Sequence, residues 1–212
     1  MTTLPHLSLS LMLLTTTAFL LAGLVKGVVG LGLPTLAMAL LALAMPPAQA
    51  AALLILPSLV TNVWQMRPWP TLAPMTRRLW PMQAGVVAGT LGGAWLLGAP
   101  AGAWAMQALG AALVVYGLWG LSGARVSQVP AGAERVLGPL VGAVTGLVTA
   151  ATGVFVIPTV PYLQALGLSR DELVQAMGLS FTVSTVALAA GLMLNGQCSA
   201  AALSGSALML LP

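Results

Sequence analysis

The segment GLVKGVVGLGLPT, from Gly23 to Thr35, returns with one insertion as GLVTAATGVFVIPT, from Gly146 to Thr159. Both copies lie in long apolar stretches, and both carry glycine shortly before a proline. Because glycine permits irregular backbone and proline suits the first turn of a new helix, each copy predicts a broken helix. In a membrane protein, two such interrupted segments in corresponding halves are typical of transporters.

The composition indicates that the chain lies in a lipid bilayer. Of its 212 residues, 59% are hydrophobic and only 5% are charged. A membrane β-barrel would need alternating apolar and polar residues, and runs such as AALLILPSLV do not alternate. We therefore predict an all-α, polytopic membrane helical bundle. With a net charge of +4 and little surface outside the lipid, nucleic acid is not an expected partner.

The apolar segments predict about seven spans and two short half-helices. The spans lie near residues 8–31, 48–66, 79–97, 101–121, 136–157, 172–194 and 199–212, and the half-helices near 34–45 and 158–167. As one straight helix, residues 8–45 would be about 55 Å long, well beyond the apolar thickness of a bilayer. The half-helices are therefore expected to be re-entrant. The repeated segments divide the chain into a first repeat at 1–122 and a second at 134–212.

The arginines predict how the bundle is oriented. Arg67, Arg77 and Arg78 lie between the second and third spans, and Arg125 and Arg135 lie between the fourth and fifth. The positive-inside rule assigns both loops to the cytoplasm. With re-entrant half-helices that do not cross, the N-terminus is then cytoplasmic and the two repeats are parallel.

Glycine recurs at four-residue spacing on two of the spans. The two stripes are Gly85, Gly89 and Gly93 on one span and Gly138, Gly142 and Gly146 on another. Small residues at this spacing let helix backbones approach closely, so we interpret the stripes as packing surfaces.

Lys26 is the most informative single residue, because it lies inside the first apolar run with no acidic residue in that run. A lysine in mid-membrane costs about 2.5–3.5 kcal/mol on insertion scales, which favours a functional role. The alternative is a side chain that reaches up to an interface. Lys26 corresponds to Thr149 in the second copy, so only one repeat carries the charge.

Half-helices that begin near Pro34 and Pro158 would direct unpaired N–H groups at an anion in each break. Hydroxyls and amides nearby add hydrogen-bonding groups, although threonines in membrane helices often bond their own backbone and amides often join helices. The predicted substrate-binding side chains are Lys26, Thr35, Ser58, Asn62, Gln65, Thr149, Thr152, Thr159, Ser180 and Ser184.

The titratable residues argue against catalysis and metal binding. Glu134, Asp171 and Glu172 lie at predicted helix ends or loops, and His6 lies near the N-terminus. No buried carboxylate is expected to relay protons or hold a metal, and no nucleophile has a partner base. We therefore expect no enzyme activity, no cofactor and no metal site.

The chain resembles the TauE/SafE family of bacterial inner-membrane sulfite exporters. The resemblance lies in GLVKGVVGLGLP followed by LALAMPPAQAAALLILPSLVTNVWQ, and in GLVTAATGVFVIP followed by GLSRDELVQAMGLSFTVSTV. It covers nearly the whole chain. It implies an eight-helix permease of two similar four-helix halves that moves sulfite, sulfonates or related sulfur oxyanions. The family motifs put the substrate path around Gly27, Gly30, Gly32, Pro34, Gly153 and Pro158.

Two departures from the family pattern stand out. Phe155 replaces a glycine at the position of Gly32, so the two breaks should differ in shape. The chain also ends at Pro212 within a seventh segment of about 14 apolar residues, shorter than the roughly 17 of a span. We expect either a truncated product or a homodimer or partner subunit that completes the bundle.

The sequence therefore predicts an inner-membrane secondary transporter, an exporter of small anions, that works by alternating access at the interface of two repeats. One alternative is a non-transporting membrane subunit or assembly factor. Another is a transporter of a different small solute, such as a metal cation or a neutral metabolite.

Overall fold

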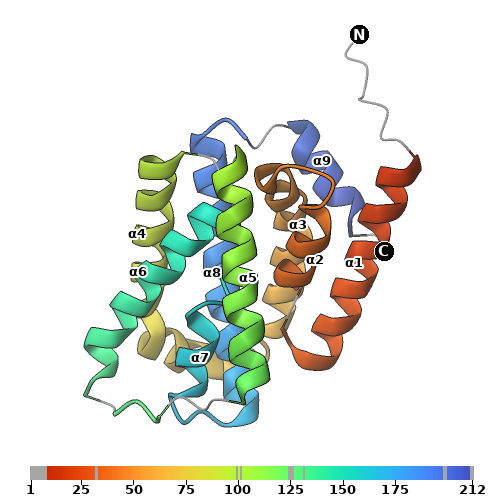
Figure 1. Cartoon of the computed structure of the whole chain (residues 1–212). Helices are drawn as coiled ribbons and strands as arrows, with labels where there is room; N and C mark the ends of the chain where they lie inside the picture. Colours follow the sequence, from red (N-terminus) through yellow and green to blue (C-terminus); the bar gives the residue numbers. More distant parts are fainter. Residues whose placement is uncertain are drawn as a thin grey trace.

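The computed structural model describes residues 9–210, apart from 32, 99, 101, 124–126, 131 and 198–199. These residues form an all-α bundle (Figure 1), which confirms the predicted fold class. Its helices are α1 (Leu9–Val29), α2 (Leu33–Leu41), α3 (Pro47–Gln65), the short 3-10 helix η1 (Trp69–Thr71), α4 (Leu72–Leu97), α5 (Gly102–Ser122), α6 (Glu134–Thr152), α7 (Thr159–Gln164), α8 (Arg170–Leu194) and α9 (Ala200–Leu208).

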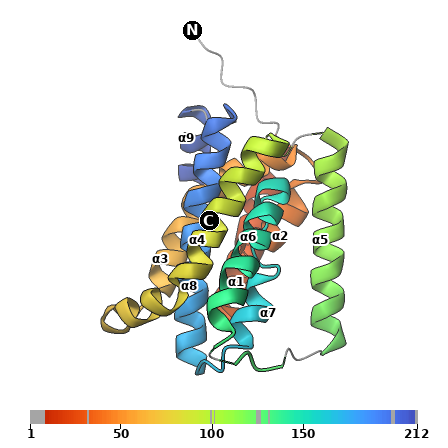
Figure 2. The same ribbon diagram turned by 90° about the vertical axis from the view of Figure 1, so that its left-hand side faces the viewer.

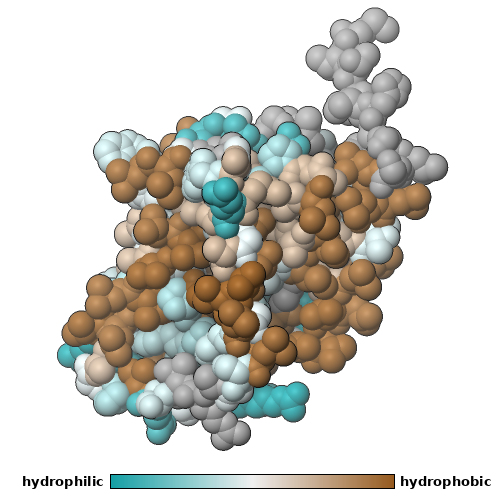
Figure 3. Space-filling model, in the orientation of Figure 1, coloured by the Kyte–Doolittle hydropathy of each residue, from teal (hydrophilic) through white to brown (hydrophobic). Residues whose placement is uncertain are grey.

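Five of the described helices are long and apolar enough to cross a membrane: α1, α3, α5, α6 and α8. The 26-residue α4 is less apolar, because it is rich in glycine and carries Gln83 and two arginines. Apolar side chains cover much of the face drawn in Figure 3, and strongly polar ones lie mainly towards its two ends. The chain is a multi-pass membrane protein.

Both predicted breaks are present, and they correspond in detail. Gly30 follows α1 with a φ of 77°, and its N–H donates to the carbonyl of Lys26 over 2.7 Å. Gly153 follows α6 with a φ of 74°, and its N–H donates to the carbonyl of Thr149 over 2.7 Å. A positive φ favours glycine, so the repeated glycine ends each long helix in the same way.

Contacts at the end of α3 show the relative directions of α1, α3 and α8. The side chain of Gln65, the last residue of α3, donates to the carbonyl of Gly30, just beyond α1, over 3.0 Å. The same amide donates to the carbonyl of Val174, near the start of α8, over 3.2 Å. Helices α1 and α3 therefore run parallel, and α8 runs against both.

Helices α4 and α6 run with α8. Asn195, just after α8, donates to the carbonyl of Ala94 near the end of α4 over 3.1 Å. At the other end of the bundle, Arg78 near the start of α4 pairs with Glu134 at the start of α6 at 2.6 Å. Figure 1 and Figure 2 show the result, in which α1 descends while α6 ascends.

The prediction of parallel repeats is therefore wrong, because the corresponding helices α1 and α6 run in opposite directions. A re-entrant half-helix, as the sequence predicts, would return the chain to the end of the bundle where α1 stops. In the structure, α2 and residues 42–46 take the chain back to the end where α1 begins, and α3 starts from there. The repeats are inverted as a consequence.

The two glycine stripes pack against each other, which confirms their interpretation as packing surfaces. A Cβ atom added to Gly142 on α6 would lie 2.1 Å from the carbonyl oxygen of Met82 on α4. One added to Gly89 on α4 would lie 2.2 Å from the carbonyl oxygen of Ala143 on α6. No side chain fits at these distances, so the backbones of α4 and α6 are in direct contact.

Helix α9 supplies a hydrogen bond that a proline removes from α3. Pro57 lies inside α3 and has no N–H to donate to the carbonyl of Leu53. The hydroxyl of Ser206 on α9 donates to that carbonyl over 2.8 Å, and it accepts from the N–H of Leu56 over 3.0 Å. Ser206 is fully buried, so it binds α9 to α3 and satisfies backbone that water cannot reach.

We expect Ser206→Ala to destabilise the protein by about 1 kcal/mol, because the Leu53 carbonyl is left unpaired in an apolar site. Thermal unfolding of the detergent-solubilised protein measures this loss. In a Pro57→Ala background, the new N–H of residue 57 can donate to Leu53, so the cost of Ser206→Ala should shrink. An equal cost in both backgrounds would contradict the assignment.

Candidate functional site

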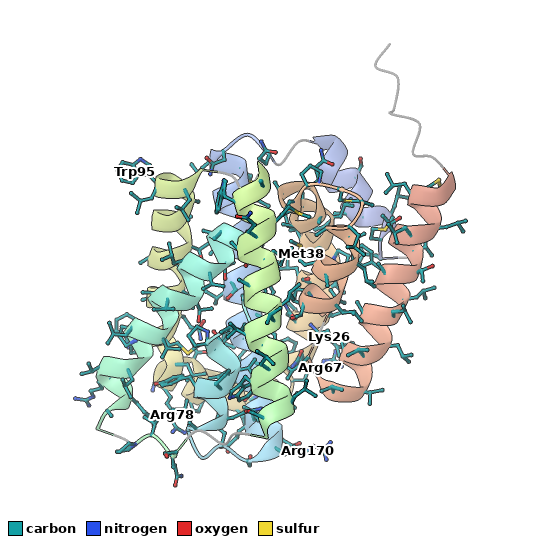
Figure 4. The ribbon with its side chains drawn as sticks, in the orientation of Figure 1. Lys26, Met38, Arg67, Arg78, Trp95 and Arg170 are labelled. Atoms are coloured by element: carbon teal, nitrogen blue, oxygen red, sulfur yellow. The ribbon has the colours of Figure 1, made fainter. Side chains whose placement is uncertain are left out.

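A cavity of about 600 Å³ lies where the end of α1 meets the end of α3. Most of the lining comes from α1 and α3, and single residues of α2 and α8 complete it. Figure 4 labels two of its residues, Lys26 and Arg67, in the half of the bundle that also holds Arg78 and Arg170. The lining residues are Gly23, Lys26, Gly27, Gly30, Leu33, Val60, Thr61, Trp64, Gln65, Arg67 and Val174.

Lys26 points into the bundle and not out towards an interface. Its side chain is 8% exposed, although most of α1 around it faces outwards. The ammonium donates a hydrogen bond to the amide oxygen of Asn62 on α3. The Asn62 amide nitrogen in turn donates to the hydroxyl of Thr185 on α8 over 3.4 Å. This chain of contacts joins the charge of the first repeat to a helix of the second.

None of the acidic side chains that the structure describes lies against Lys26. Glu134 is held by Arg78, whose guanidinium donates to its two carboxylate oxygens over 2.9 and 2.6 Å. Glu172 accepts from the N–H of Ser169 over 2.9 Å in the capping box of α8. Asp171 lines a separate hollow at the start of α8. The charge of Lys26 is therefore paired with a neutral amide alone among the described residues.

The two breaks meet at the centre of the molecule. A small cavity of about 10 Å³ is lined by Pro34 from the first break, Gly153 and Phe155 from the second, and Ser58 and Thr185 from α3 and α8. That volume is close to the minimum for one water molecule. The hydroxyl of Ser58 is buried here and has no hydrogen-bond partner among the described residues.

Three predicted site residues on α3 lie at helical spacing and lead from one cavity to the other. Gln65 lines the large cavity, Asn62 holds Lys26, and Ser58 lines the small one. Gly27 and Gly30 also line the large cavity, and Pro34 and Gly153 line the small one. The structure thus brings these predicted residues together along one side of α3.

The threonines of the second repeat mostly satisfy backbone. Thr149, the counterpart of Lys26, donates to the carbonyl of Thr145 over 2.7 Å, and Thr152 donates to that of Val148 over 2.7 Å. Thr159 shares a 2.9 Å hydrogen bond with the Thr145 hydroxyl. The contacts of Thr149 and Thr152 follow the alternative in which membrane threonines bond their own helix, whereas that of Thr159 joins α7 to α6.

The remaining predicted residues lie elsewhere. Ser180 accepts from Gln83 of α4 over 2.8 Å, and the buried hydroxyls of Ser184 and Thr35 have no partner among the described residues. Pro158 precedes the six-residue α7 and lines neither cavity. Gly32 lies outside the described residues.

Four residues that the structure brings to these sites were not predicted from the sequence. Trp64 and Arg67 line the large cavity with Lys26, and so does Thr61. Thr185 contacts Asn62 and lines the small cavity. The signal for Trp64 and Arg67 was available, since both lie within the turns that follow Asn62.

Comparison with known proteins assigns the family. The family model described as "Sulfite exporter TauE/SafE" matches residues 15–212. No curated protein and no solved structure gives a significant match to the chain. The family match spans both breaks, the large cavity and the inverted pair of repeats. The chain therefore belongs to the sulfite exporter TauE/SafE family of membrane transporters.

Proposed function

We propose that the protein is a secondary transporter that exports small anions such as sulfite, sulfonates or related sulfur oxyanions. The observation that carries this proposal is Lys26, a buried cation with no acidic side chain beside it, in a cavity of about 600 Å³. A bound anion would supply the missing negative charge. A metal cation would be repelled from the same site.

The position of Lys26 favours a substrate over a purely structural role. A lysine within the membrane costs about 2.5–3.5 kcal/mol on insertion scales. The hydrogen bond to Asn62 leaves the charge itself uncompensated. Membrane proteins usually pair such charges or use them on a substrate pathway, and the family supports the second reading.

The two cavities support an alternating-access mechanism. The large cavity holds Lys26, and the small one, further along α3, admits about one water molecule at about 10 Å³. An oxyanion therefore cannot pass between the two breaks unless the repeats move apart there. Inverted repeats around a central site are the architecture in which one repeat rocks against the other. Phe155 and Thr185, which line the small cavity, are the proposed barrier.

The inverted fold changes the predicted orientation in the membrane. Arg67, Arg78 and Arg170 lie towards one end of the bundle (Figure 4), and α1 begins at the other (Figure 1). The positive-inside rule and a cytoplasmic N-terminus thus cannot both hold. We propose that the arginine end, and with it the large cavity, faces the cytoplasm of a bacterial inner membrane. An exporter would then load its substrate at Lys26.

Cysteine labelling tests this orientation. In a Cys198→Ser background, Ser127→Cys marks the arginine end and Gln197→Cys marks the opposite end, and both positions are exposed. A membrane-impermeant thiol reagent added to intact spheroplasts should label residue 197 and leave residue 127 unlabelled until the cells are opened. The reverse pattern would show that the arginine end faces outwards.

Flux into proteoliposomes tests the function itself. Purified protein should move labelled sulfite or a sulfonate down its gradient with saturation, whereas labelled Zn²⁺ and a neutral sugar should not move above the protein-free control. If no anion of the panel moves, the transporter proposal fails. Co-purification of one stable membrane partner would then favour an assembly subunit.

A further inference from the structure

Arg67 and Trp64 form a second cationic group at the mouth of the Lys26 cavity. The guanidinium carbon of Arg67 lies 3.6 Å from the centroid of the Trp64 ring. Both side chains line the same cavity as Lys26. Trp64 is 65% exposed, whereas Lys26 is 8% exposed, so the stacked pair is the outer group and Lys26 the inner one.

The hydrogen-bonding groups of Arg67 are available, unlike those of Arg78. Arg78 donates to both carboxylate oxygens of Glu134 and to the carbonyl of Leu166 at 3.0 Å, so its guanidinium is already occupied by contacts within the protein. Among the described residues, no acceptor takes a hydrogen bond from the Arg67 side chain, and no acidic residue lines its cavity.

Stacking orients Arg67 for an anion. A guanidinium above an indole is held by its flat face, which leaves the N–H groups at its edge for a ligand. These donors match two oxygens of one sulfonate, sulfite or phosphate group. The Trp64 ring thus gives an exposed arginine a fixed place beside the cavity.

We propose that Arg67, stacked on Trp64, is the oxyanion-binding residue at the mouth of the cavity and passes its anion on to Lys26. The inference rests on the proposed function. A cation at the mouth raises the local concentration of anions and speeds their entry, and salt screens this effect. Lys26 instead neutralises the anion inside the protein. Loss of Arg67 should therefore raise KM and leave the maximal rate largely intact.

The test is the concentration dependence of sulfite flux in proteoliposomes at low ionic strength. We expect Arg67→Gln to raise KM at least tenfold with a maximal rate within twofold of the parent. Arg67→Lys, which keeps the charge but loses the planar donors, should raise KM less. The matched control is Arg77→Gln, an exposed arginine at the same end that does not line the cavity, and it should keep the parental KM.

Variants of the aromatic partner extend the test. Trp64→Phe keeps a π face and should stay close to the parent, whereas Trp64→Ala should raise KM as Arg67→Gln does. High salt should raise the KM of the parent towards that of Arg67→Gln.

The Arg67 guanidinium could also bind the phosphate of a lipid headgroup, and the flux assay distinguishes a lipid from a transported anion. If Arg67 holds a lipid headgroup, Arg67→Gln will leave the KM for sulfite unchanged and will lower the thermal stability in lipid. That outcome overturns the inference while parental flux upholds the proposed function. If the parent itself shows no saturable anion flux, both proposals fall.

Discussion

Lys26→Met should abolish anion flux without removing the protein from the membrane. Methionine is similar in length to lysine but carries no charge, so the anion loses the buried positive charge of Lys26. At an effective dielectric constant of about 20, unit charges 4 Å apart attract by about 4 kcal/mol, so we expect binding to weaken roughly a hundredfold or more. Flux per molecule in proteoliposomes, with the protein quantified in the same vesicles, measures the loss.

The amount of Lys26→Met in the membrane should equal or exceed that of the parent, because the variant avoids the insertion cost of a charged side chain. Lys26→Arg, which keeps the charge, should retain measurable flux. Parental flux from Lys26→Met would contradict the site, since the lysine would then be merely tolerated.

Gly142→Ala should have the largest effect on stability. The added Cβ would lie 2.1 Å from the Met82 carbonyl oxygen and 2.9 Å from the Val86 nitrogen, so α4 and α6 would have to separate. Overpacking of this kind costs about 1–3 kcal/mol and occasionally more, and we expect the upper end here. For a chain of this size that corresponds to a fall in Tm of roughly 6–12 °C, measured by thermal unfolding in detergent.

The matched control is Gly110→Ala on α5. Gly110 is also a helical glycine, but an added Cβ would have nothing within 4 Å. Alanine is the better helix former by about 1 kcal/mol, so Gly110→Ala should leave Tm unchanged or raise it. If both variants shift Tm equally, the close contact of α4 with α6 is not what holds this part of the bundle.

The glycine and proline pattern was sufficient to predict both breaks. Gly30 and Gly153 occupy equivalent positions in the two copies, and each ends its helix with a positive φ. The stripes on α4 and α6 were equally readable, because four-residue glycine spacing on a membrane helix has few other uses. These features depend on local backbone chemistry, which the sequence states directly.

The relative direction of the repeats was not readable in the same way. It depends on whether a half-helix returns the chain to the end where its long helix began, and the local glycine and proline pattern does not specify this. The structure shows the direction through tertiary contacts such as those of Gln65 with Gly30 and Val174. With inverted repeats, the positive-inside rule places the start of α1 on the side of the membrane away from the cytoplasm.

The candidate site was partly readable. Lys26, Asn62 and Gln65 were identifiable as polar groups in apolar helices, and the structure brings them together. The second-repeat threonines were given equal weight, yet Thr149 and Thr152 bond the carbonyls of their own helix. A threonine can satisfy its hydroxyl locally, whereas a lysine or an asparagine needs a partner from another helix, and this difference would have improved the prediction.

Chemical restoration of the charge is the most direct test of the claim that a cation at position 26 binds the substrate. In a Cys198→Ser background, Lys26→Cys should show no anion flux in proteoliposomes. Treatment with 2-aminoethyl methanethiosulfonate, which attaches an ammonium, should restore flux, and neutral methyl methanethiosulfonate should not. Equal flux after either reagent, or full flux before treatment, would contradict the account.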